Sequence, residues 1–492
     1  MSTGSSFNPN HEISDQVRSK FFIDGVWKAP SGSARLDLIS PITEELFLRV
    51  PEAAPADIDN AVEAARNAFD NGPWPRMSPV ERSRYIAALG EELARREPIL
   101  SKVWTAQVGA PVSFTEVNAP LIPTVYSYYA SLGETYPFVE DRALSAGYAE
   151  VRQEPVGVAA IIVPWNAPLI LMSFAIAPAL LAGCTIVLKP APEAPLEALL
   201  LAECAQTIGL PPGVLNVLPA GRETGDYLIR HKGVDKIAFT GSGLTGRHIA
   251  SVAGESLKRV GLELGGKSAA VFLEDADLNL AFQSVVPVSM FFSGQGCLAF
   301  TRLLVPRSRH QEITAAYSAA VGQVRVGDPW DPQTQLGPLS IRRQLDRVLG
   351  YIEKGKEAGA RLVRGGGRDL RFAKGYYVEP TIFDDVQSDM VIAQEEIFGP
   401  VVCVIPYDDE EDAVRIANAS TYGLNGSVHS KDSERAANFA RKIRTGNITV
   451  NGFNLQASIP YGGFKQSGYG RVGGVEGLHS YVETKAIYMP DR

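Results

Sequence analysis

Hydrophobic positions between residues 155 and 260 form short apolar runs that alternate with helix-like patterns. Runs at residues 156–163, 185–189, 214–218 and 236–240 predict buried strands, and the segments at 168–181, 194–208 and 224–231 predict helices between them. Near-continuous apolar strands separated by helices are typical of a parallel sheet that is covered on both faces. The pattern therefore predicts a doubly wound, Rossmann-like α/β fold, which binds nucleotides at the carboxyl ends of its strands.

One uncharged segment, residues 155–188, is long enough to be a transmembrane candidate. Prolines at positions 164, 168 and 178 and the turn Gly183-Cys184-Thr185 interrupt it. We therefore expect a buried strand, helix and strand there and no membrane insertion. A second α/β alternation follows residue 297, with helices expected near 311–321, 341–358, 410–419 and 433–442.

Composition narrows the class of protein. A chain of 492 residues, 45% hydrophobic and 21% charged, can form two or three domains. Its net charge of -8 and pI near 5.5 give nucleic-acid binding no electrostatic support. The four cysteines show no C-x-x-C pair and the six histidines no H-x-x-x-H pair, so we expect neither a disulfide framework nor a metal site. The N-terminus lacks the basic residues and apolar run of a signal peptide, so we expect a cytoplasmic protein.

A glycine-rich turn follows the strand predicted at residues 236–240. The sequence Gly241-Ser-Gly-Leu-Thr-Gly246 fits G-x-G-x-x-G at the start of a helix, where N–H groups and the helix dipole favour a phosphate. A plain Rossmann interpretation seeks an acidic ribose ligand about 20 residues further on, near Glu263. Glu263 also lies between apolar neighbours, where its pKa can rise and fit it to act as a base. These two interpretations, and a solvated strand residue, remain open at this point.

Cys297 lies in the segment 291–302, and no charged residue occurs from position 278 to 301. A free thiol is mostly protonated at neutral pH, so a nucleophilic cysteine needs a base, a cation or oriented N–H groups nearby. The alternative is a buried small hydrophobe, because free cysteine is among the most buried residue types.

Together these residues resemble the aldehyde dehydrogenase superfamily. Glu263 within Leu-Glu-Leu-Gly-Gly-Lys precedes Cys297 within Gly-Gln-Gly-Cys by 34 positions. Other matching motifs follow in chain order from about residue 20 to the C-terminus: Pro164-Trp-Asn-Ala-Pro168, Lys189-Pro190, Gly209-Leu-Pro-Pro-Gly213, Phe239-Thr-Gly-Ser242, Glu395-Glu-Ile-Phe-Gly-Pro400, Asn451-Gly452 and Gly462-Gly-Phe-Lys-Gln-Ser-Gly468.

The resemblance implies roles for three catalytic residues. Cys297 is expected to attack an aldehyde, and Asn166, with the Cys297 backbone N–H, to stabilise the oxyanion of the thiohemiacetal. Glu263 is expected to be the general base that activates the water hydrolysing the thioester, rather than a ribose ligand. The implied enzyme is an NAD(P)-dependent, non-acylating aldehyde dehydrogenase. A non-catalytic nucleotide-binding member is an alternative that the presence of all three residues disfavours. A CoA-acylating enzyme is another, disfavoured because Glu263 provides the hydrolytic base that such a reaction would have to avoid.

The resemblance also implies two sets of binding residues. The cofactor, NAD with NADP possible, is expected at Ile162, Pro164, Trp165, Lys189, Gly221, Phe239, Gly241, Ser242, Leu264, Glu396 and Phe398. A tunnel for a medium to bulky apolar aldehyde (aromatic, terpenoid or medium-chain aliphatic) is expected at Leu121, Ala167, Phe174, Phe291, Leu298 and Tyr461.

The sequence departs from the family pattern at three positions. Some relatives carry a lysine and a glutamate, proposed to relay protons, where this chain has Ala175 and Val472. Pro192 stands where NAD-preferring relatives often have a glutamate that binds the adenosine ribose. Without that carboxylate a 2'-phosphate is not repelled, so we expect activity with both cofactors and better use of NAD.

The family fold implies three structural parts. We expect a cofactor-binding domain at residues 1–135 and 155–263, a catalytic domain at 264–467, and a bridging, oligomerisation element at 136–154 and 468–492. The exposed strands of that element need a partner, which predicts a homodimer or homotetramer. The expected small-molecule partner is an aldehyde, with no nucleic acid and no membrane.

Overall fold

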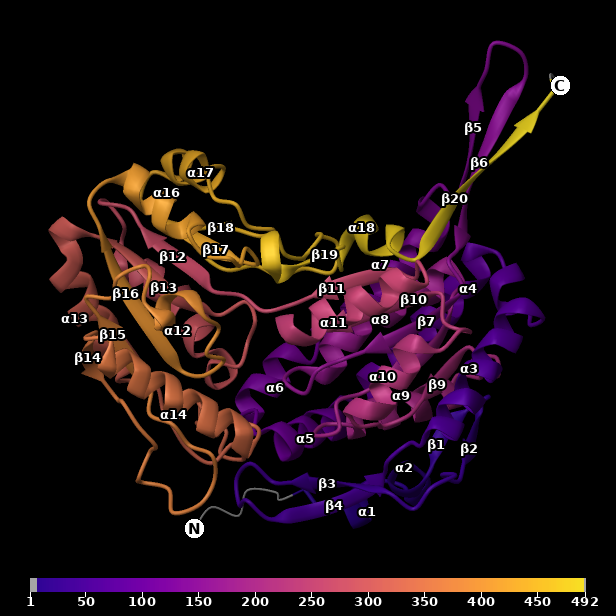
Figure 1. Cartoon of the computed structure of the whole chain (residues 1–492), viewed down its shortest axis with the longest axis horizontal. Coiled ribbons are helices and arrows are strands. Elements are labelled where there is room, and N and C mark those ends of the chain that lie inside the picture. The colour runs from indigo at the N-terminus through magenta and orange to yellow at the C-terminus, as the bar shows by residue number, and fades with distance from the viewer. Residues whose placement is uncertain (1–6, 491–492) are drawn as a thin grey trace.

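The structure, a computed structural model that describes residues 7–490, contains two α/β lobes and a projecting arm of strands (Figure 1). The ends of the predicted domain ranges at residues 1–6 and 491–492 lie outside the described residues. The arm carries the C-terminal strand and projects from the lobe built by the first half of the chain.

The first lobe is built on an eight-stranded sheet whose five central strands are parallel. Its order is β19 (Gly468–Tyr469), β11 (Arg259–Glu263), β10 (Lys236–Thr240), β7 (Val158–Ile162), β8 (Thr185–Lys189), β9 (Leu215–Val217), β1 (Phe21–Ile23) and β2 (Val26–Lys28). The strands β19, β1 and β2 pair antiparallel to their neighbours.

Helices cover both faces of this sheet, as the sequence predicts. Alternate residues of β7 enter different cores: Val158, Ala160 and Ile162 pack on one face, and Ala159 and Ile161 on the other. The first face is covered by α3 (Pro55–Asp70), α10 (Arg222–Arg230) and α11 (Gly243–Glu255). The second is covered by α4 (Pro79–Arg95), α5 (Glu97–Val108), α7 (Leu121–Thr135), α8 (Pro168–Ala182) and α9 (Leu196–Thr207).

The second lobe is built on a seven-stranded sheet. Its order is β14 (Arg361–Arg364), β15 (Thr381–Asp384), β16 (Val401–Tyr407), β13 (Phe300–Pro306), β12 (Ser268–Phe272), β17 (Gly426–His429) and β18 (Thr449–Val450), and β14 alone is antiparallel to its neighbour. One face packs on α12 (Leu278–Met290) and α13 (His310–Val321). The other packs on α14 (Arg342–Glu357), α15 (Val391–Gln394), α16 (Glu410–Asn418) and α17 (Ser433–Ala440).

The projecting arm is a three-stranded antiparallel sheet in the order β20 (Val482–Met489), β6 (Tyr148–Pro155) and β5 (Val139–Ala143). A two-stranded sheet pairs β3 (Arg35–Ile39) with β4 (Leu46–Pro51). The remaining helices are α1 (Pro9–Glu12), α2 (Asp15–Ser19), α6 (Val112–Asn118) and α18 (Gly474–His479), with 3-10 turns η1 (Trp74–Arg76), η2 (Phe291–Gly294), η3 (Arg307–Arg309) and η4 (Lys465–Ser467). The division into three domains stays a prediction, and β19, from the range assigned to the bridging element, pairs in the first sheet.

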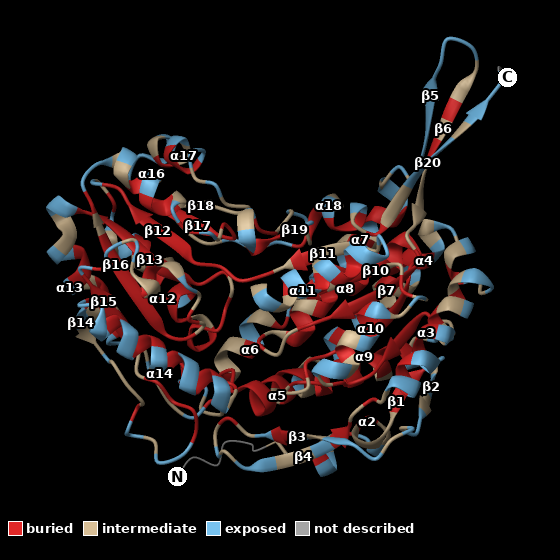
Figure 2. Ribbon diagram, in the orientation of Figure 1, coloured by how far each residue is buried: buried red, intermediate tan, exposed pale blue. Residues whose placement is uncertain are grey.

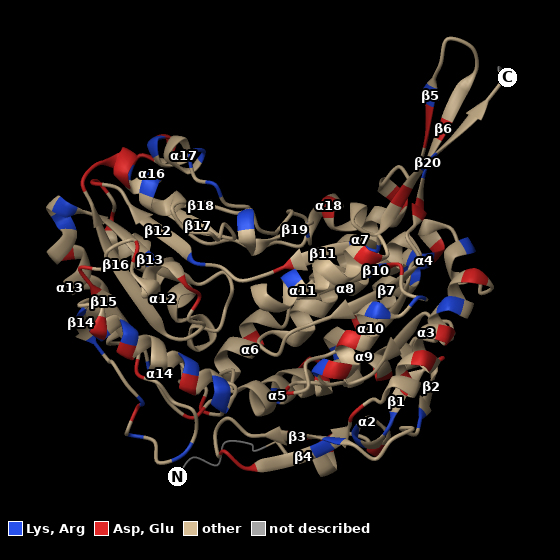
Figure 3. Cartoon of the chain, viewed as in Figure 1, with Lys and Arg blue, Asp and Glu red and all other residues tan. Residues whose placement is uncertain are grey.

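The predicted strands and helices are confirmed to within about two residues at most of their ends. The uncharged segment forms β7, α8 and β8, and α8 ends at Gly183, whose φ of 99° is left-handed. No helix within residues 7–490 is long and apolar enough to cross a bilayer. Both sheets are buried (Figure 2), and charged residues lie largely on the surrounding helices and loops (Figure 3). The buried parallel strands explain the near-continuous apolar runs in the sequence.

Candidate active site

Four parallel strands of the first sheet bring the predicted cofactor residues to one edge. Ile162 ends β7 and Lys189 ends β8, while Gly241 follows β10 and Leu264 follows β11. Because neighbouring parallel strands end at the same edge, these residues lie near one another. Pro164 and Trp165 continue from β7 and are partly exposed.

Lys189 is buried at this edge and keeps one N–H group available. Its Nζ donates to the backbone oxygens of Pro190 at 2.9 Å and Ala220 at 2.8 Å. Burial lowers the pKa of Lys189 to about 8, and the carboxylates of Glu193 and Glu52 act in the opposite direction. An ammonium group has three N–H donors, so one remains for a ligand hydroxyl.

The neighbourhood of Lys189 contains a carboxylate that sequence analysis did not assign to the site. Glu52 Oε1 accepts a hydrogen bond from the backbone N–H of Gly221 at 3.1 Å. Gly221 precedes α10, and Gly225 in that helix faces the aliphatic part of Lys189. Glu52 is some 170 residues away from these partners in the sequence, and no local motif marks it.

The glycine-rich turn after β10 begins a helix, as predicted. Ser242 is the N-cap of α11 and accepts from the N–H of Thr245 at 3.4 Å. Gly241 lies under the ring of Phe239, since a Cβ there would be 2.5 Å from Phe239 Cζ. Leu264 packs on Gly246 in the first turns of the same helix. The free N–H groups at this helix start suit an anionic group such as a pyrophosphate.

The second lobe contributes Glu396 and Phe398 from the connection between α15 and β16. Glu396 Oε1 accepts from the N–H of Gly266 at 3.0 Å, and burial raises the pKa of Glu396 to about 6. The ring of Phe398 meets Trp165 edge-on, with centroids 5.6 Å apart. These groups suit the parts of a dinucleotide. The Lys189 ammonium can donate to a ribose hydroxyl, the start of α11 suits the phosphates, and the Glu396 carboxylate can accept from a ribose hydroxyl.

The three predicted catalytic residues come from three separate loops. Asn166 precedes α8, Glu263 ends β11, and Cys297 lies between η2 and β13. Asn166 Nδ2 donates to the backbone oxygen of Gln295 at 2.9 Å, which joins it to the nucleophile loop (residues 291–298). A Cβ on Gly266 would lie 2.3 Å from the backbone oxygen of Cys297, so the loop after Glu263 touches the nucleophile loop directly.

The thiol of Cys297 lies in surroundings that favour its neutral form. Its side chain keeps some exposure. Burial raises the pKa of Cys297 to about 12, and the carboxyls of Glu396 and Glu263 raise it further while Tyr461 lowers it. The thiolate therefore forms only when a proton acceptor or new positive charge reaches the site.

The surroundings of Glu263 also favour the neutral form of its carboxyl. Burial raises the pKa of its carboxyl well above the usual value, and Arg471 opposes that effect. Its Oε1 lies against Gly462, where a Cβ would be 2.7 Å away, and its Oε2 has no hydrogen-bond partner within residues 7–490. In its ionised form, a carboxylate with a raised pKa binds a proton more strongly than an ordinary one, and the free oxygen of Glu263 is suited to accept that proton from water.

Tyr461 places a buried hydroxyl beside the thiol. Two backbone hydrogen bonds with Val472, of 2.7 and 2.8 Å, fix its position. Its hydroxyl makes no hydrogen bond of good geometry with the described residues, yet it lies close enough to Cys297 to lower the pKa of that thiol. The sequence predicts Tyr461 as a tunnel residue, but its hydroxyl also lies near the Cys297 sulfur.

The six predicted tunnel residues divide between two apolar clusters. Leu121, Ala167, Phe174 and Phe291 pack with the helices of the first lobe, and Leu298 and Tyr461 with the second. Phe174 and Leu298 are buried, and the other four are partly exposed.

Phe114 of α6 belongs with this group although sequence analysis did not identify it. Its ring meets Phe291 edge-on at 4.6 Å. Phe291 in turn faces Gly296, next to the nucleophile. No motif surrounds Phe114, so only the folded chain brings it to the site.

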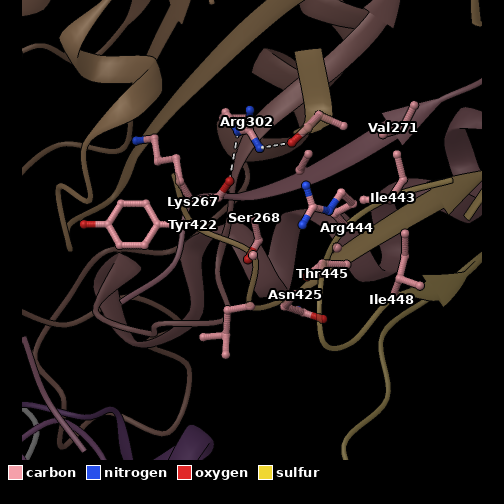
Figure 4. A pocket seen from close by; sticks show the side chains of 15 residues that line it. Lys267, Ser268, Val271, Arg302, Tyr422, Asn425, Ile443, Arg444, Thr445 and Ile448 are labelled. Atoms are coloured by element: carbon pink, nitrogen blue, oxygen red, sulfur yellow. Dashed lines mark hydrogen bonds between the residues drawn. The ribbon is translucent and has the colours of Figure 1, made fainter. Parts of the chain in front are cut away.

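Arg302 anchors the loop that follows Glu263. Buried at the start of β13, it donates to the backbone oxygens of Lys267 at 2.9 Å and Ala417 at 3.0 Å (Figure 4), and also to that of Ile416 at 3.0 Å. A cavity of about 20 Å³ beside it, lined also by Ser268 and Thr445, has room for about one water molecule. The catalytic residues do not line this cavity.

One cluster of potential metal ligands occurs in the described part of the chain, although sequence analysis expects no metal. Atoms of His310, Asp384 and Asp385 lie within 4.8 Å of one another. The His310 ring contacts Asp384 at 2.5 Å, and Arg361 forms ion pairs with both carboxylates. Arg361 and His310 thus already occupy the carboxylates of the cluster, which lies outside the loops of the predicted catalytic residues.

Comparison with known proteins agrees with this arrangement. Residues 27–487 match the Aldehyde dehydrogenase family. Geranial dehydrogenase of Castellaniella defragrans is 42% identical over 470 residues, which cover 95% of this chain and 98% of that protein.

Two solved structures are similar over nearly their whole length. An aldehyde dehydrogenase of Mycobacterium tuberculosis complexed with NAD+ is 47% identical with a TM-score of 0.94, covering 96% of this chain and 98% of that one. A mutant of aldehyde dehydrogenase C of Pseudomonas syringae, complexed with NAD+ and octanal, is 39% identical with a TM-score of 0.93, covering 96% and 97%.

The position of Tyr461 gives a prediction for the thiol. Tyr461→Phe removes the hydroxyl that lowers the pKa of Cys297, so that pKa rises. At pH 8, which is below the thiol pKa, iodoacetamide reacts with the small thiolate fraction of Cys297. A higher pKa makes this fraction smaller, so alkylation should slow by about tenfold, which corresponds to roughly 1.4 kcal/mol. Mass spectrometry of Cys297 against time measures this rate.

Tyr317→Phe is the matched control, because the Tyr317 hydroxyl is equally buried and its ring packs on Phe282 in another part of the core. An unchanged alkylation rate in Tyr461→Phe would show that its hydroxyl does not act on the thiol.

Proposed function

The chain belongs to the aldehyde dehydrogenase family and oxidises an aldehyde with NAD, and we propose that Cys297, Asn166 and Glu263 carry out this reaction. The observation that supports the assignment best is the meeting of three loops. Asn166 binds the nucleophile loop at 2.9 Å, and Gly266, three residues after Glu263, lies against the backbone of Cys297.

The first step is the attack of the Cys297 sulfur on the aldehyde carbon. The thiol proton leaves to a base, a C–S bond forms, and the carbonyl oxygen becomes the oxyanion of a thiohemiacetal. One N–H of the Asn166 amide is held by Gln295, so its second N–H is free to donate to that oxyanion. The Cys297 backbone N–H is the second proposed donor.

The second step converts the thiohemiacetal into a thioester and then an acid. When bound, the nicotinamide supplies a hydride acceptor. Glu263, after it has lost its own proton, takes a proton from water, whose oxygen attacks the thioester carbon, and the thiolate leaves as the carboxylic acid is released. Its raised pKa and free oxygen favour this base role. Ala175 and Val472 pack in the same apolar cluster, so proton exchange at Glu263 must use water or backbone groups.

We propose that Lys189 and Glu396 hold the two riboses of the cofactor and that Ser242 with the start of α11 holds its pyrophosphate. The remaining predicted residues, Ile162, Pro164, Trp165, Gly221, Phe239, Gly241, Leu264 and Phe398, form its walls. Although Pro192 supplies no carboxylate, Glu193 and Glu52 place negative charge around Lys189. That charge disfavours a 2'-phosphate and supports a preference for NAD, with NADP as the weaker cofactor.

For the substrate we propose a medium to bulky apolar aldehyde. Five of the six predicted tunnel residues are purely apolar, and Phe114 adds another aromatic ring beside Phe291. Such a wall gains from burying apolar surface and offers nothing to balance a carboxylate or a quaternary ammonium. The geranial and octanal that appear among the relatives are aldehydes of this kind.

We also propose that the arm mediates assembly into a dimer or tetramer. The residues of β5 are all exposed, and Val139, Leu144, Tyr488 and Met489 present apolar surface on the arm.

All four cysteines are free, which suits a reducing compartment, and we propose a cytoplasmic location.

Separate loss of the nucleophile and of the base should affect different steps. Cys297→Ala should abolish turnover. Glu263→Gln should retain part of a first-turnover burst of NADH while its steady-state rate falls by about two to four orders of magnitude. Stopped-flow and steady-state absorbance at 340 nm measure both. Near wild-type turnover in either variant would refute the assignment, and a rate restored by CoA would indicate an acylating enzyme.

Neutralising the carboxylates near Lys189 should weaken discrimination against NADP. Glu193→Gln and Glu52→Gln should each raise the ratio of kcat/KM for NADP to that for NAD by about 3- to 10-fold, the effect of one partly solvated charge. Glu255→Gln, at the far end of α11, is the control and should leave the ratio unchanged. If the ratio of kcat/KM for NADP to that for NAD stays at its wild-type value in all three variants, the 2'-hydroxyl of the bound cofactor does not lie near these carboxylates.

Narrowing the tunnel should discriminate between aldehydes by size. Ala167→Phe adds a ring at a partly exposed position next to Asn166, so it should lower kcat/KM for geranial or octanal at least about tenfold more than for propanal. Propanal serves as the internal control for damage to the catalytic residues. If the bulky-to-small ratio does not move, or if betaine aldehyde or succinic semialdehyde is the best substrate of a panel, the proposed tunnel is wrong.

A further inference from the structure

Trp104 links the two loops that carry Asn166 and Cys297. It belongs to α5 and is 5% exposed, and its indole Nε1 donates to the backbone oxygen of Asn166 at 3.0 Å. The helix α5 supplies none of the residues predicted for the site from sequence. Its one direct hydrogen bond to the segment of Asn166 therefore suggests a supporting role.

These contacts form a closed network that joins Trp104 and Asn166 to the nucleophile loop. Trp104 holds the backbone of Asn166, and Asn166 Nδ2 donates to the backbone oxygen of Gln295 at 2.9 Å. Gln295 Nε2 donates to the backbone oxygen of Phe292 at 3.2 Å. The ring of Phe292 then lies 6.5 Å, centroid to centroid, from that of Trp104. A shift of any one member displaces the others.

The segment of this network that lies in the nucleophile loop has an unfavourable backbone conformation. Phe292 and Ser293 have φ values of 50° and 56°, which L-residues rarely adopt. External contacts hold this turn: Ser293 Oγ donates to Gly337 at 2.7 Å, and the side chain of Gln295 accepts from the N–H of Ser340 at 3.0 Å. A turn that needs such support moves when a supporting contact is lost.

We propose that Trp104 is a positioning residue that holds Asn166 so that its second amide N–H points at the oxyanion; this rests on the proposed role of Asn166. The side chain of Asn166 is anchored on one side by Gln295, so the direction of its free N–H depends on where its backbone lies. The indole N–H fixes that backbone. Without it, the buried oxygen of Asn166 loses a partner and the amide is no longer preorganised.

A double-mutant cycle tests this proposal. Trp104→Phe and Trp104→Tyr both remove the indole N–H and keep an aromatic ring. Each should lower kcat/KM for the aldehyde by about tenfold through kcat, with the KM for NAD unchanged. In an Asn166→Ala background the same substitutions should have no further effect, because the group on which Trp104 acts is already gone.

Trp74→Phe is the matched control. Trp74 is fully buried in the same core, and its Nε1 has no hydrogen-bond partner within residues 7–490. This variant should lower the melting temperature about as much as Trp104→Phe while leaving kcat/KM unchanged.

Three results would overturn the inference while leaving the proposed function intact. These are an unchanged kcat/KM in both Trp104 variants, an equal loss in both backgrounds, and a failure of both variants to fold when Trp74→Phe folds. If instead Asn166→Ala itself keeps wild-type kcat/KM, the proposed role of Asn166 is wrong and the inference fails with it.

Discussion

The structure depends most on how closely the loop after β11 approaches the nucleophile loop. A Cβ on Gly266 would lie 2.3 Å from the backbone oxygen of Cys297, and one on Gly265 would lie 2.4 Å from Glu396 Oε2. No side chain fits at Gly266, and one at Gly265 would displace the Glu396 carboxylate. Because this loop joins the first sheet to the second, the same two glycines bring Glu263, Cys297 and Glu396 together. Arg302 then fixes the loop by binding the backbone oxygen of Lys267.

The same close packing explains the charge state of the site. Burial raises the pKa values of Cys297, Glu263 and Glu396 and lowers that of Lys267 to about 8, so each group is shifted toward its neutral form. Lys267 Nζ has no hydrogen-bond partner among the described residues. In such surroundings an oxyanion depends on oriented N–H groups, which is the role proposed for the Asn166 amide.

The sequence alone predicts those features of the fold that depend on the local pattern of apolar, polar and glycine residues. The apolar runs identify β7, β8 and β10, and the glycine-rich turn identifies the start of α11, because strand burial and helix initiation are local properties. The catalytic residues are found through motifs whose order matches a family. Trp104, Phe114 and Glu52 are not found, because each acts through a partner far away in the sequence. Pro192 illustrates the same limit: the missing carboxylate is visible in the sequence, but the charges of Glu52 and Glu193 near Lys189 appear only after folding.

Aromatic packing joins the substrate wall to the oxyanion site. Phe291 meets Phe114 at 4.6 Å, and Phe114 meets Trp104 at 5.5 Å. Trp104 in turn binds the backbone of Asn166. A substrate that contacts Phe291 in the proposed tunnel would therefore act on the same aromatic stack that is proposed to orient Asn166. Side chains that interdigitate at native density transmit such displacements, since they leave few voids to absorb them. With the proposed assignments, the fit of the aldehyde at Phe291 and the alignment of the Asn166 amide are for this reason not independent properties of the fold.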